Sequence, residues 1–280
     1  MQAPPTRFVL AAALALGLGG LLACATPFPG APLPAPPSHP NGQVLWRIVH
    51  DSCVPGQRDN ENPAPCALVS LGEGEPRGFV ILKDREGVAQ HLLLPTAKVT
   101  GIEDPAVVSP DAPNYFAQAW VAKSFVEARL GGPVPREEMS VAVNSLYGRS
   151  QDQLHLHIDC LAFEVRDALR ADAPRIGPVW SAHPFTFDGH PYRVMRIDGD
   201  SLGGVSPFRR LARGLPGAAH DMGAWTLVLA GARTADGRPG FYLLAARADP
   251  ASGVAASGEE LQDHSCKGQQ IARHAPPPGI

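Results

Sequence analysis

The pattern of apolar and polar positions is most regular in residues 153–159. Apolar side chains alternate there with the polar side chains of Gln153, His155, His157 and Asp159. A strand turns successive side chains to opposite faces, so one face of this segment is expected to be buried while the other carries two imidazoles. In a helix the two histidines would point in different directions. The spacing therefore predicts a strand whose polar face carries chemistry.

The segment before this strand alternates in the same way. Residues 139–143 predict a strand that leads into Asn144. Residues 145–152, which contain Tyr-Gly-Arg-Ser, then read as the connection between two antiparallel strands. Together the two segments predict a hairpin.

Further elements are expected around this hairpin. A second hairpin joins residues 78–83 to residues 90–95 through a turn at 84–87, and apolar residues at helical spacing predict a helix over residues 114–130. Paired glycines follow that helix and end it. Residues 43–49 fit either a helix or a strand. The order of the main elements is therefore strand, strand, helix, strand, strand.

The second half of the chain shows a similar order. We expect a strand over residues 192–197, a short helix over 207–215, and a hairpin of residues 224–230 and 241–246 about residues 234–237. No His-x-His occurs in this half. Two interpretations fit: a degenerate second copy of the first unit that packs on it, and an unrelated α+β extension. Both give an α+β fold in which helices flank an antiparallel sheet.

The first residues read as a targeting segment. Arg7 precedes an apolar run over residues 8–23, which leads into Cys24 through Leu-Leu-Ala. This pattern predicts a secretory signal with a lipoprotein processing site; an uncleaved membrane anchor and an ordinary cleaved signal are the alternatives. The proline-rich residues 25–42 predict an extended, semi-rigid spacer. An anchored chain would hold the folded body outside the cytoplasm, beside a membrane.

Cysteine usage agrees with export. Of the five cysteines, those other than Cys24 are even in number, which predicts two disulfides in an exported chain. We pair Cys53 with Cys66 across a short polar loop, and Cys160 with Cys266 by default, although the sequence allows three pairings. A Cys–His metal site is the competing interpretation, and the lack of a Cys-x-x-Cys spacing counts against it.

Composition limits the partners. The chain has 280 residues, of which 44% are hydrophobic, and this is enough for a large core. Lysine and arginine total 24 against 27 acidic residues, a formal net charge of −3. No overall basic field attracts a polynucleotide, so we do not expect a nucleic-acid partner.

The polar face of the central strand suits attack on a phosphoanhydride. A neutral imidazole can attack phosphorus at working pH, which makes His155 the candidate for a covalent nucleotidyl intermediate. His157 can donate a hydrogen bond to the phosphoryl oxygens. Gln153, Asn144 and Ser150 are candidates for binding the phosphate. A metal site of the form His-x-His-x-Asp and a purely structural histidine pair are the alternatives.

These residues resemble the histidine-triad superfamily of nucleotide hydrolases and transferases. In that superfamily an asparagine closes one strand, a loop with glycine and serine wraps a phosphate, and His-x-His-x-His follows on the next strand. Asn144, Ser150, Gln153, His155 and His157 fall in that order, with glutamine in place of the first histidine. The family's nucleophile is the middle histidine, so the resemblance assigns this role to His155. It also implies a dimer or an internally duplicated chain.

Longer segments resemble a narrower branch, the bacterial CDP-diacylglycerol pyrophosphatases. This likeness is carried by residues 91–96, 150–160, 231–242 and 257–266. It implies hydrolysis of CDP-diacylglycerol to CMP and phosphatidate, with no metal or other cofactor. It also implies an enzyme anchored at its N-terminus in the bacterial inner membrane with its catalytic body in the periplasm. The expected assembly is a monomer with pseudo-dimer halves or a homodimer.

The resulting hypothesis divides the chain into five parts and leaves two other functions open. The alternatives are a hydrolase or transferase that acts on a soluble nucleotide diphosphate, and a non-catalytic envelope lipoprotein that binds lipid or nucleotide. The five parts are a targeting segment (1–24), the spacer (25–42), a histidine-triad-like catalytic unit (43–172), a second α+β half (173–274) and a tail (275–280).

Overall fold

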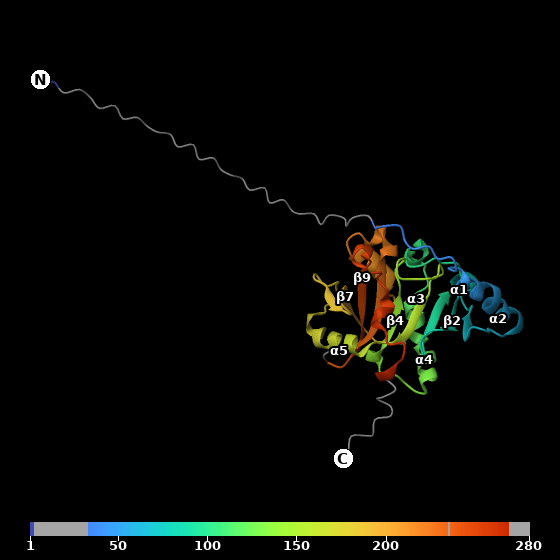
Figure 1. The fold of residues 1–280 in the computed structure, drawn as a ribbon. Coiled ribbons are helices and arrows are strands. Elements are labelled where there is room, and N and C mark those ends of the chain that lie inside the picture. Colours follow the sequence, from blue (N-terminus) through green and yellow to red (C-terminus); the bar gives the residue numbers. More distant parts are fainter. Residues whose placement is uncertain (3–32, 235, 269–280) are drawn as a thin grey trace, which may run out of the picture. The chain divides into compact units, whose positions relative to one another are not determined.

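A computed structural model describes residues 1–2, 33–234 and 236–268, and the folded body begins at Leu33. The predicted targeting segment beyond its first two residues, the first part of the spacer and the tail lie outside the described residues. The body is built on one nine-stranded antiparallel sheet with the strand order β1-β2-β3-β5-β4-β8-β9-β7-β6, and Figure 1 shows α2 and α5 towards opposite ends of it. The predicted α+β class is confirmed.

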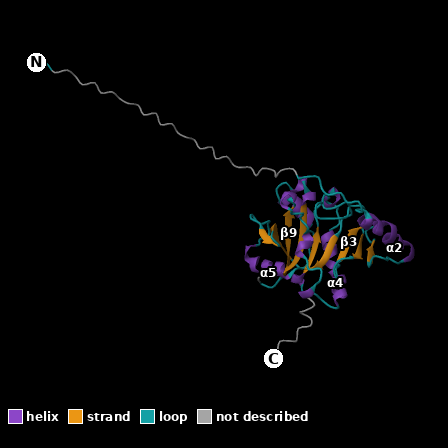
Figure 2. Cartoon of the chain, viewed as in Figure 1, coloured by secondary structure: helices purple, strands orange, loops and turns teal. Residues whose placement is uncertain are grey.

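Most strands come in consecutive pairs along the chain, with helices between the pairs, and Figure 2 distinguishes strands from helices by colour. The strands are β1 (Leu68–Ser70), β2 (Phe79–Lys83), β3 (His91–Pro95), β4 (Met139–Val143), β5 (Leu156–Cys160), β6 (Phe185–Phe187), β7 (His190–Asp198), β8 (Trp225–Arg233) and β9 (Pro239–Arg247). The α-helices are α1 (Val44–Arg47), α2 (Val54–Asn60), α3 (Tyr115–Val121), α4 (Lys123–Leu130), α5 (Phe163–Asp172) and α6 (Pro207–Gly214), and a π-helical stretch (Ile48–Cys53) links α1 to α2. The 3₁₀ segments are Glu75–Arg77, Pro105–Val108, Arg136–Glu138, Ala173–Arg175, Ala218–His220, Met222–Ala224, Pro250–Ser252 and Gly258–Leu261.

The predicted hairpins are confirmed, and the helices differ from the predictions in three places. β2 pairs with β3, β4 with β5, and β8 with β9, each in antiparallel register. Residues 43–49 are mostly helical, and the expected helix over 114–130 is two helices that break at Ala122. We did not predict α5, because only Val165 and Leu169 are buried among its residues and two positions do not make a period.

The two halves of the body repeat one pairing order. The first half runs outward from the centre as β4, β5, β3 and β2, and the second as β8, β9, β7 and β6. A helical segment separates the two hairpins in each half, namely α3 and α4 in the first and α6 in the second. β4 pairs with β8, so the halves share one continuous sheet.

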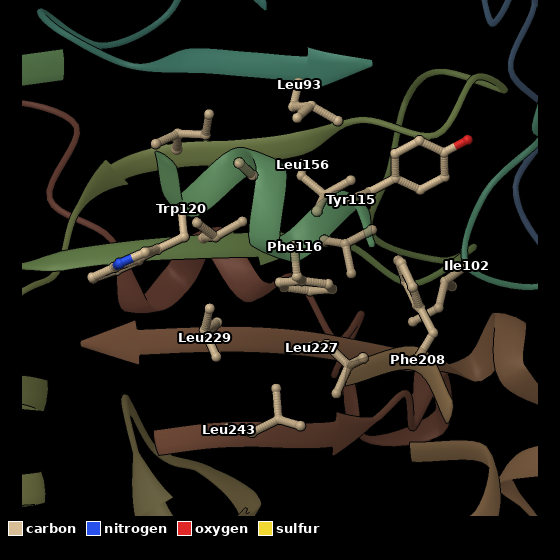
Figure 3. Packing of buried hydrophobic residues seen from close by; sticks show 14 of the residues in the cluster. Leu93, Ile102, Tyr115, Phe116, Trp120, Leu156, Phe208, Leu227, Leu229 and Leu243 are labelled. Carbon is tan, nitrogen blue, oxygen red and sulfur yellow. The ribbon is translucent and has the colours of Figure 1, made fainter. Parts of the chain in front are cut away.

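One face of the sheet carries the larger apolar core. α3, α4 and α6 cover this face, and Figure 3 shows Phe116 and Trp120 among leucines of the neighbouring strands. The ring of Phe116 lies 5.1 Å from that of Phe208 on α6, and the ring of Trp120 lies 4.9 Å from that of Phe241 on β9. These contacts bind both halves to one core.

The opposite face holds two smaller apolar clusters with a polar strip between them. One cluster packs under α5 and the other under α2 and the π-helical stretch. The strip on β4 and β5 between them contains Ser140, Asn144, His155 and His157, all of which are buried. The fold therefore leaves polar side chains in the middle of an otherwise apolar face.

Both predicted disulfides are confirmed. Cys53 bonds to Cys66 and joins the N-terminal helices to the loop before β1. Cys160 at the end of β5 bonds to Cys266, which fastens the C-terminal segment beside the polar strip.

Residues 33–42, the end of the proline-rich segment, contact the folded body. The hydroxyl of Tyr147 donates to the carbonyl oxygen of Pro34 at 2.8 Å, and His39 lies 3.1 Å from the carboxylate of Asp152. The spacer prediction therefore applies to the residues before Leu33, which lie outside the described part. None of the described helices has the length and apolar character needed to cross a bilayer.

Candidate active site

His155 and His157 lie side by side on the polar strip. β5 begins at Leu156, so His157 belongs to the strand and His155 directly precedes it. Leu156 and Ile158 point into the larger core, as the alternating pattern predicts. The two imidazole rings are 4.9 Å apart, and the residues are 7% and 5% exposed. The strand thus presents two nearly buried rings together.

The surroundings of His155 fix which nitrogen is reactive. Its Nδ1 lies 2.6 Å from the carbonyl oxygen of Gln153. A carbonyl oxygen only accepts hydrogen bonds, so Nδ1 carries the proton and Nε2 keeps its lone pair. Nε2 has no hydrogen-bond partner among the residues that the structure describes. Burial, with repulsion from His157, lowers the pKa of His155 to about 3, so the ring is neutral at ordinary pH.

A narrow hollow lies beside His155. It is lined in part by Gly101, Asn144, Arg149 and Gln153. Arg149 makes two hydrogen bonds to the carboxylate of Glu103, at 2.6 and 2.8 Å, which hold its guanidinium in place. A Cβ atom on Gly101 would lie 1.8 Å from this guanidinium, so the close approach requires glycine.

A carboxylate from the C-terminal segment completes the site. Oxygens of Glu259 lie 3.0 Å from Nδ1 of His157, 2.6 Å from Nδ2 of Asn144 and 3.1 Å from Nε2 of Gln90. Burial alone would raise the pKa of Glu259, but hydrogen bonds led by that from His157 outweigh it and hold this pKa far below its usual range. Glu259 is therefore ionised and pairs with the second imidazole.

The C-terminal segment is attached to the strip at several points. Oδ1 of Asn144 accepts hydrogen bonds from the amide of Gly258 at 2.9 Å and from the hydroxyl of Ser257 at 3.2 Å. The ring of His264 lies 2.8 Å from the carboxylate of Asp159, and this hydrogen bond raises the pKa of His264. With the Cys160–Cys266 disulfide, these contacts fix where Glu259 lies.

The other predicted residues take different places. Gln153 is fully buried, and its Nε2 donates to the carbonyl oxygens of Pro95 at 3.0 Å and Ala97 at 2.9 Å. Ser150 is exposed and makes no hydrogen bond to the described residues. The structure thus brings His155, His157, Asn144 and Gln153 together and leaves the Ser150 hydroxyl apart.

Sequence reasoning missed Glu259 and Gln90. Both reach His157 from distant parts of the chain, so no local pattern indicates them. The resemblance of residues 257–266 to a known family indicated that this segment matters. It did not indicate which residue of the segment contributes to the site. His264, from the same segment, contacts Asp159 at the edge of the strip.

The metal alternative does not match the donor atoms. Within the described residues, Asp159, Cys160 and Cys266 are the one group whose ligand atoms lie close enough to share an ion. The two sulfurs are bonded to each other, so neither is a thiolate. The carboxylate of Asp159 contacts His264 and the amide of Cys160, so His155, His157 and Asp159 do not form a shared site.

The fold and the site define an α+β protein with a two-histidine site closed by a carboxylate. The family model of CDP-diacylglycerol pyrophosphatase matches residues 40–270. A CDP-diacylglycerol pyrophosphatase of Yersinia pestis is 41% identical over 236 residues, which cover 84% of this chain and 87% of that protein. The chain belongs to the CDP-diacylglycerol pyrophosphatase family, which confirms the narrower of the two resemblances.

Proposed function

We propose that this protein hydrolyses the pyrophosphate bond of CDP-diacylglycerol to CMP and phosphatidate through a covalent nucleotidyl intermediate on His155. Family membership supports the substrate. The observation that carries the mechanism is the neutral ring of His155, whose Nδ1–H is held by a carbonyl and whose Nε2 lone pair is free of described partners. A buried neutral imidazole of this kind is an activated nucleophile.

In the first step, Nε2 of His155 attacks the phosphorus that carries cytidine. A P–N bond forms, and the P–O bond to phosphatidate breaks with its electron pair on the leaving oxygen. The carbonyl oxygen of Gln153 stabilises the positive charge on the ring by accepting from Nδ1. In the second step, water attacks the same phosphorus, and the P–N bond breaks with its electron pair returning to Nε2. The proton of the water passes to solvent, and CMP leaves with His155 neutral again.

His157 and Glu259 stabilise the charge that builds on the phosphoryl oxygens. Nε2 of His157 is buried and has no partner among the described residues. This nitrogen can donate to a phosphoryl oxygen, while Nδ1 of the same ring lies 2.7 Å from the amide nitrogen of Gln90 and the Glu259 carboxylate, 3.0 Å away, balances the charge that the ring takes up. Glu259 is therefore a positioning residue. Of the predicted phosphate-binding residues, Asn144 lies beside His157 through Glu259, whereas the amide of Gln153 donates to Pro95 and Ala97 and Ser150 is exposed and lies apart.

We also propose a histidine-triad-like fold in which a duplicated unit gives a catalytic first half and a degenerate second half. The identical pairing order outward from β4 and β8 supports this proposal. The chain would then work as a monomer with two pseudo-dimer halves, or as a homodimer.

The proposed location is the bacterial inner membrane, with the body in the periplasm. The apolar run over residues 8–23 supports an anchor there. The two disulfides support an oxidising compartment.

Trapping the intermediate tests the mechanism. The purified protein is quenched in base during turnover of CDP-diacylglycerol, and an acid-labile CMP adduct should map to His155 by mass spectrometry. His155→Ala should lose the adduct and turnover by several orders of magnitude, whereas His50→Ala, a change at an exposed histidine on the π-helical stretch, should keep both. An adduct on another residue would overturn the mechanism.

Parallel assays separate the alternatives. CDP-choline hydrolysed better than CDP-diacylglycerol would favour a soluble nucleotide substrate. Activity lost with EDTA and restored with zinc would favour the metal route.

A further inference from the structure

A second cavity lies on the same face of the sheet, between α5 and the strands of the second half. Its volume is about 280 Å³, close to the lower end of the range for small-ligand pockets. Its walls come from α5 and from the ends of β8 and β9. Its lining includes Arg166, Leu169, Arg170, Arg233 and Tyr242.

The strand register places this cavity where the second half would carry its own site. One row across the sheet runs through His157, Ala142, Val228 and Leu244. His155 lies two residues before His157, and Tyr242 lies two residues before Leu244. Because side chains alternate between faces along a strand, both lie on the same face as the row. Tyr242 therefore occupies the position in the second half that His155 occupies in the first.

The chemistry of the cavity differs from that of the active site. Tyr242 is 5% exposed and lines the cavity, and its hydroxyl has no hydrogen-bond partner among the described residues. Leu169 adds apolar wall. A phenol can donate a hydrogen bond but does not attack phosphorus at neutral pH as a neutral imidazole does. The cavity is thus built for binding and not for covalent catalysis.

Three arginines line the cavity, and two of them are paired with carboxylates. Arg166 pairs with Glu138 and Asp167, both at 2.8 Å, and Arg233 pairs at 3.1 Å with Glu137, which also lines the cavity. Arg170 is exposed, and its guanidinium makes no ion pair or hydrogen bond to the described residues. Guanidinium groups bind phosphate through two parallel hydrogen bonds, so Arg170 is free to make such a pair with a ligand.

We propose that this cavity binds a phosphate monoester, the group that CMP and phosphatidate share. Arg170 and the hydroxyl of Tyr242 donate to the phosphate, and the apolar wall receives the remainder of the ligand. The choice of ligand rests on the proposed function, whereas the cavity and its side chains do not. The second half, together with α5, would then sense a product that the active site releases.

Equilibrium binding to the full chain tests this proposal. The His155→Ala protein removes turnover, and CMP, a short-chain phosphatidate and inorganic phosphate are titrated separately by calorimetry. At least one of the two products should bind at a site additional to the active site. Arg170→Ala combined with Tyr242→Phe should weaken that binding about tenfold or more, the loss expected for a charge-assisted hydrogen bond. The arms with CMP and phosphatidate show which product is the source.

A matched control decides the location. Arg213 is an exposed arginine on α6 without a partner among the described residues, so Arg213→Ala should leave the second binding event unchanged. No second binding event with either product, binding of inorganic phosphate alone, or a loss caused by Arg213→Ala instead of the cavity variant would each overturn the proposal. Turnover that survives in His155→Ala would instead overturn the proposed function, so the two failures are distinguishable.

Discussion

In the proposed mechanism, His155 and His157 take different roles because their surroundings differ. Burial keeps the ring of His155 neutral while its Nδ1 donates to a backbone carbonyl, whereas Nδ1 of His157 lies 3.0 Å from an ionised carboxylate. A neutral ring is suited to attack and a ring beside a negative charge is suited to donate. At the scale of single residues, the environment and not the amino acid decides the role.

Glu259→Gln tests this division of roles. The amide keeps the size of the side chain but removes the charge that supports a protonated His157. We expect turnover to fall about a hundredfold, within the range for general acid–base groups. Steady-state kinetics should show the loss mainly in kcat and little in KM, because Glu259 holds the ring of His157 and not the substrate.

The neighbouring Glu260 is the control for this change. Its carboxylate contacts Tyr192 and His190, away from the two-histidine site. Glu260→Gln should keep kcat. Equal losses of kcat in both variants would show that Glu259 has a structural role only.

At the scale of elements, the segment from Ser257 to Cys266 determines whether the site is complete. It belongs to no strand of the main sheet, and hydrogen bonds with a single disulfide hold it. The two disulfides should therefore differ in what they do for the enzyme.

Removing each disulfide separately tests this difference. Cys160 and Cys266 are 106 residues apart, and their loss should lower the free energy of unfolding by about 5 kcal/mol, against about 3 kcal/mol for Cys53 and Cys66, which are 13 apart. Replacing Cys160 and Cys266 with alanine should also lower kcat under conditions where the protein remains folded. Urea unfolding and steady-state kinetics measure both effects, and similar kcat values in the two variants would contradict this account.

The elements also show what the sequence can predict. The alternation at residues 153–159 gave the face of each histidine, because a strand's period is local. β1 and β6 are too short for their alternation to stand out, and we did not predict them. Glu259 reaches Asn144 across 115 residues, and a contact of that kind depends on the tertiary fold alone.

At the scale of the whole molecule, the pairing of β4 with β8 makes the two halves interdependent. Separation would expose the backbone of β4 along its whole length and uncover part of the shared core. Open strand edges of this kind pair with other chains.

Residues 43–172 produced alone test this interdependence. We expect a fragment that aggregates or associates through β4, because its edge is unpaired and the contact between Phe116 and Phe208 is lost. Size-exclusion chromatography and circular dichroism check this. A monomeric fragment with native strand content would show that the first half is an independent domain.

The late position of Glu259 also orders events during synthesis. The hairpin with both histidines can form while the ribosome is still adding the C-terminal segment, yet its counter-charge arrives only with Glu259, which hydrogen bonds from Asn144 and Gln90 and the nearby Cys160–Cys266 disulfide then hold. For a chain exported as proposed above, this disulfide would form only after export, so the last attachment of the site would be made in the oxidising compartment.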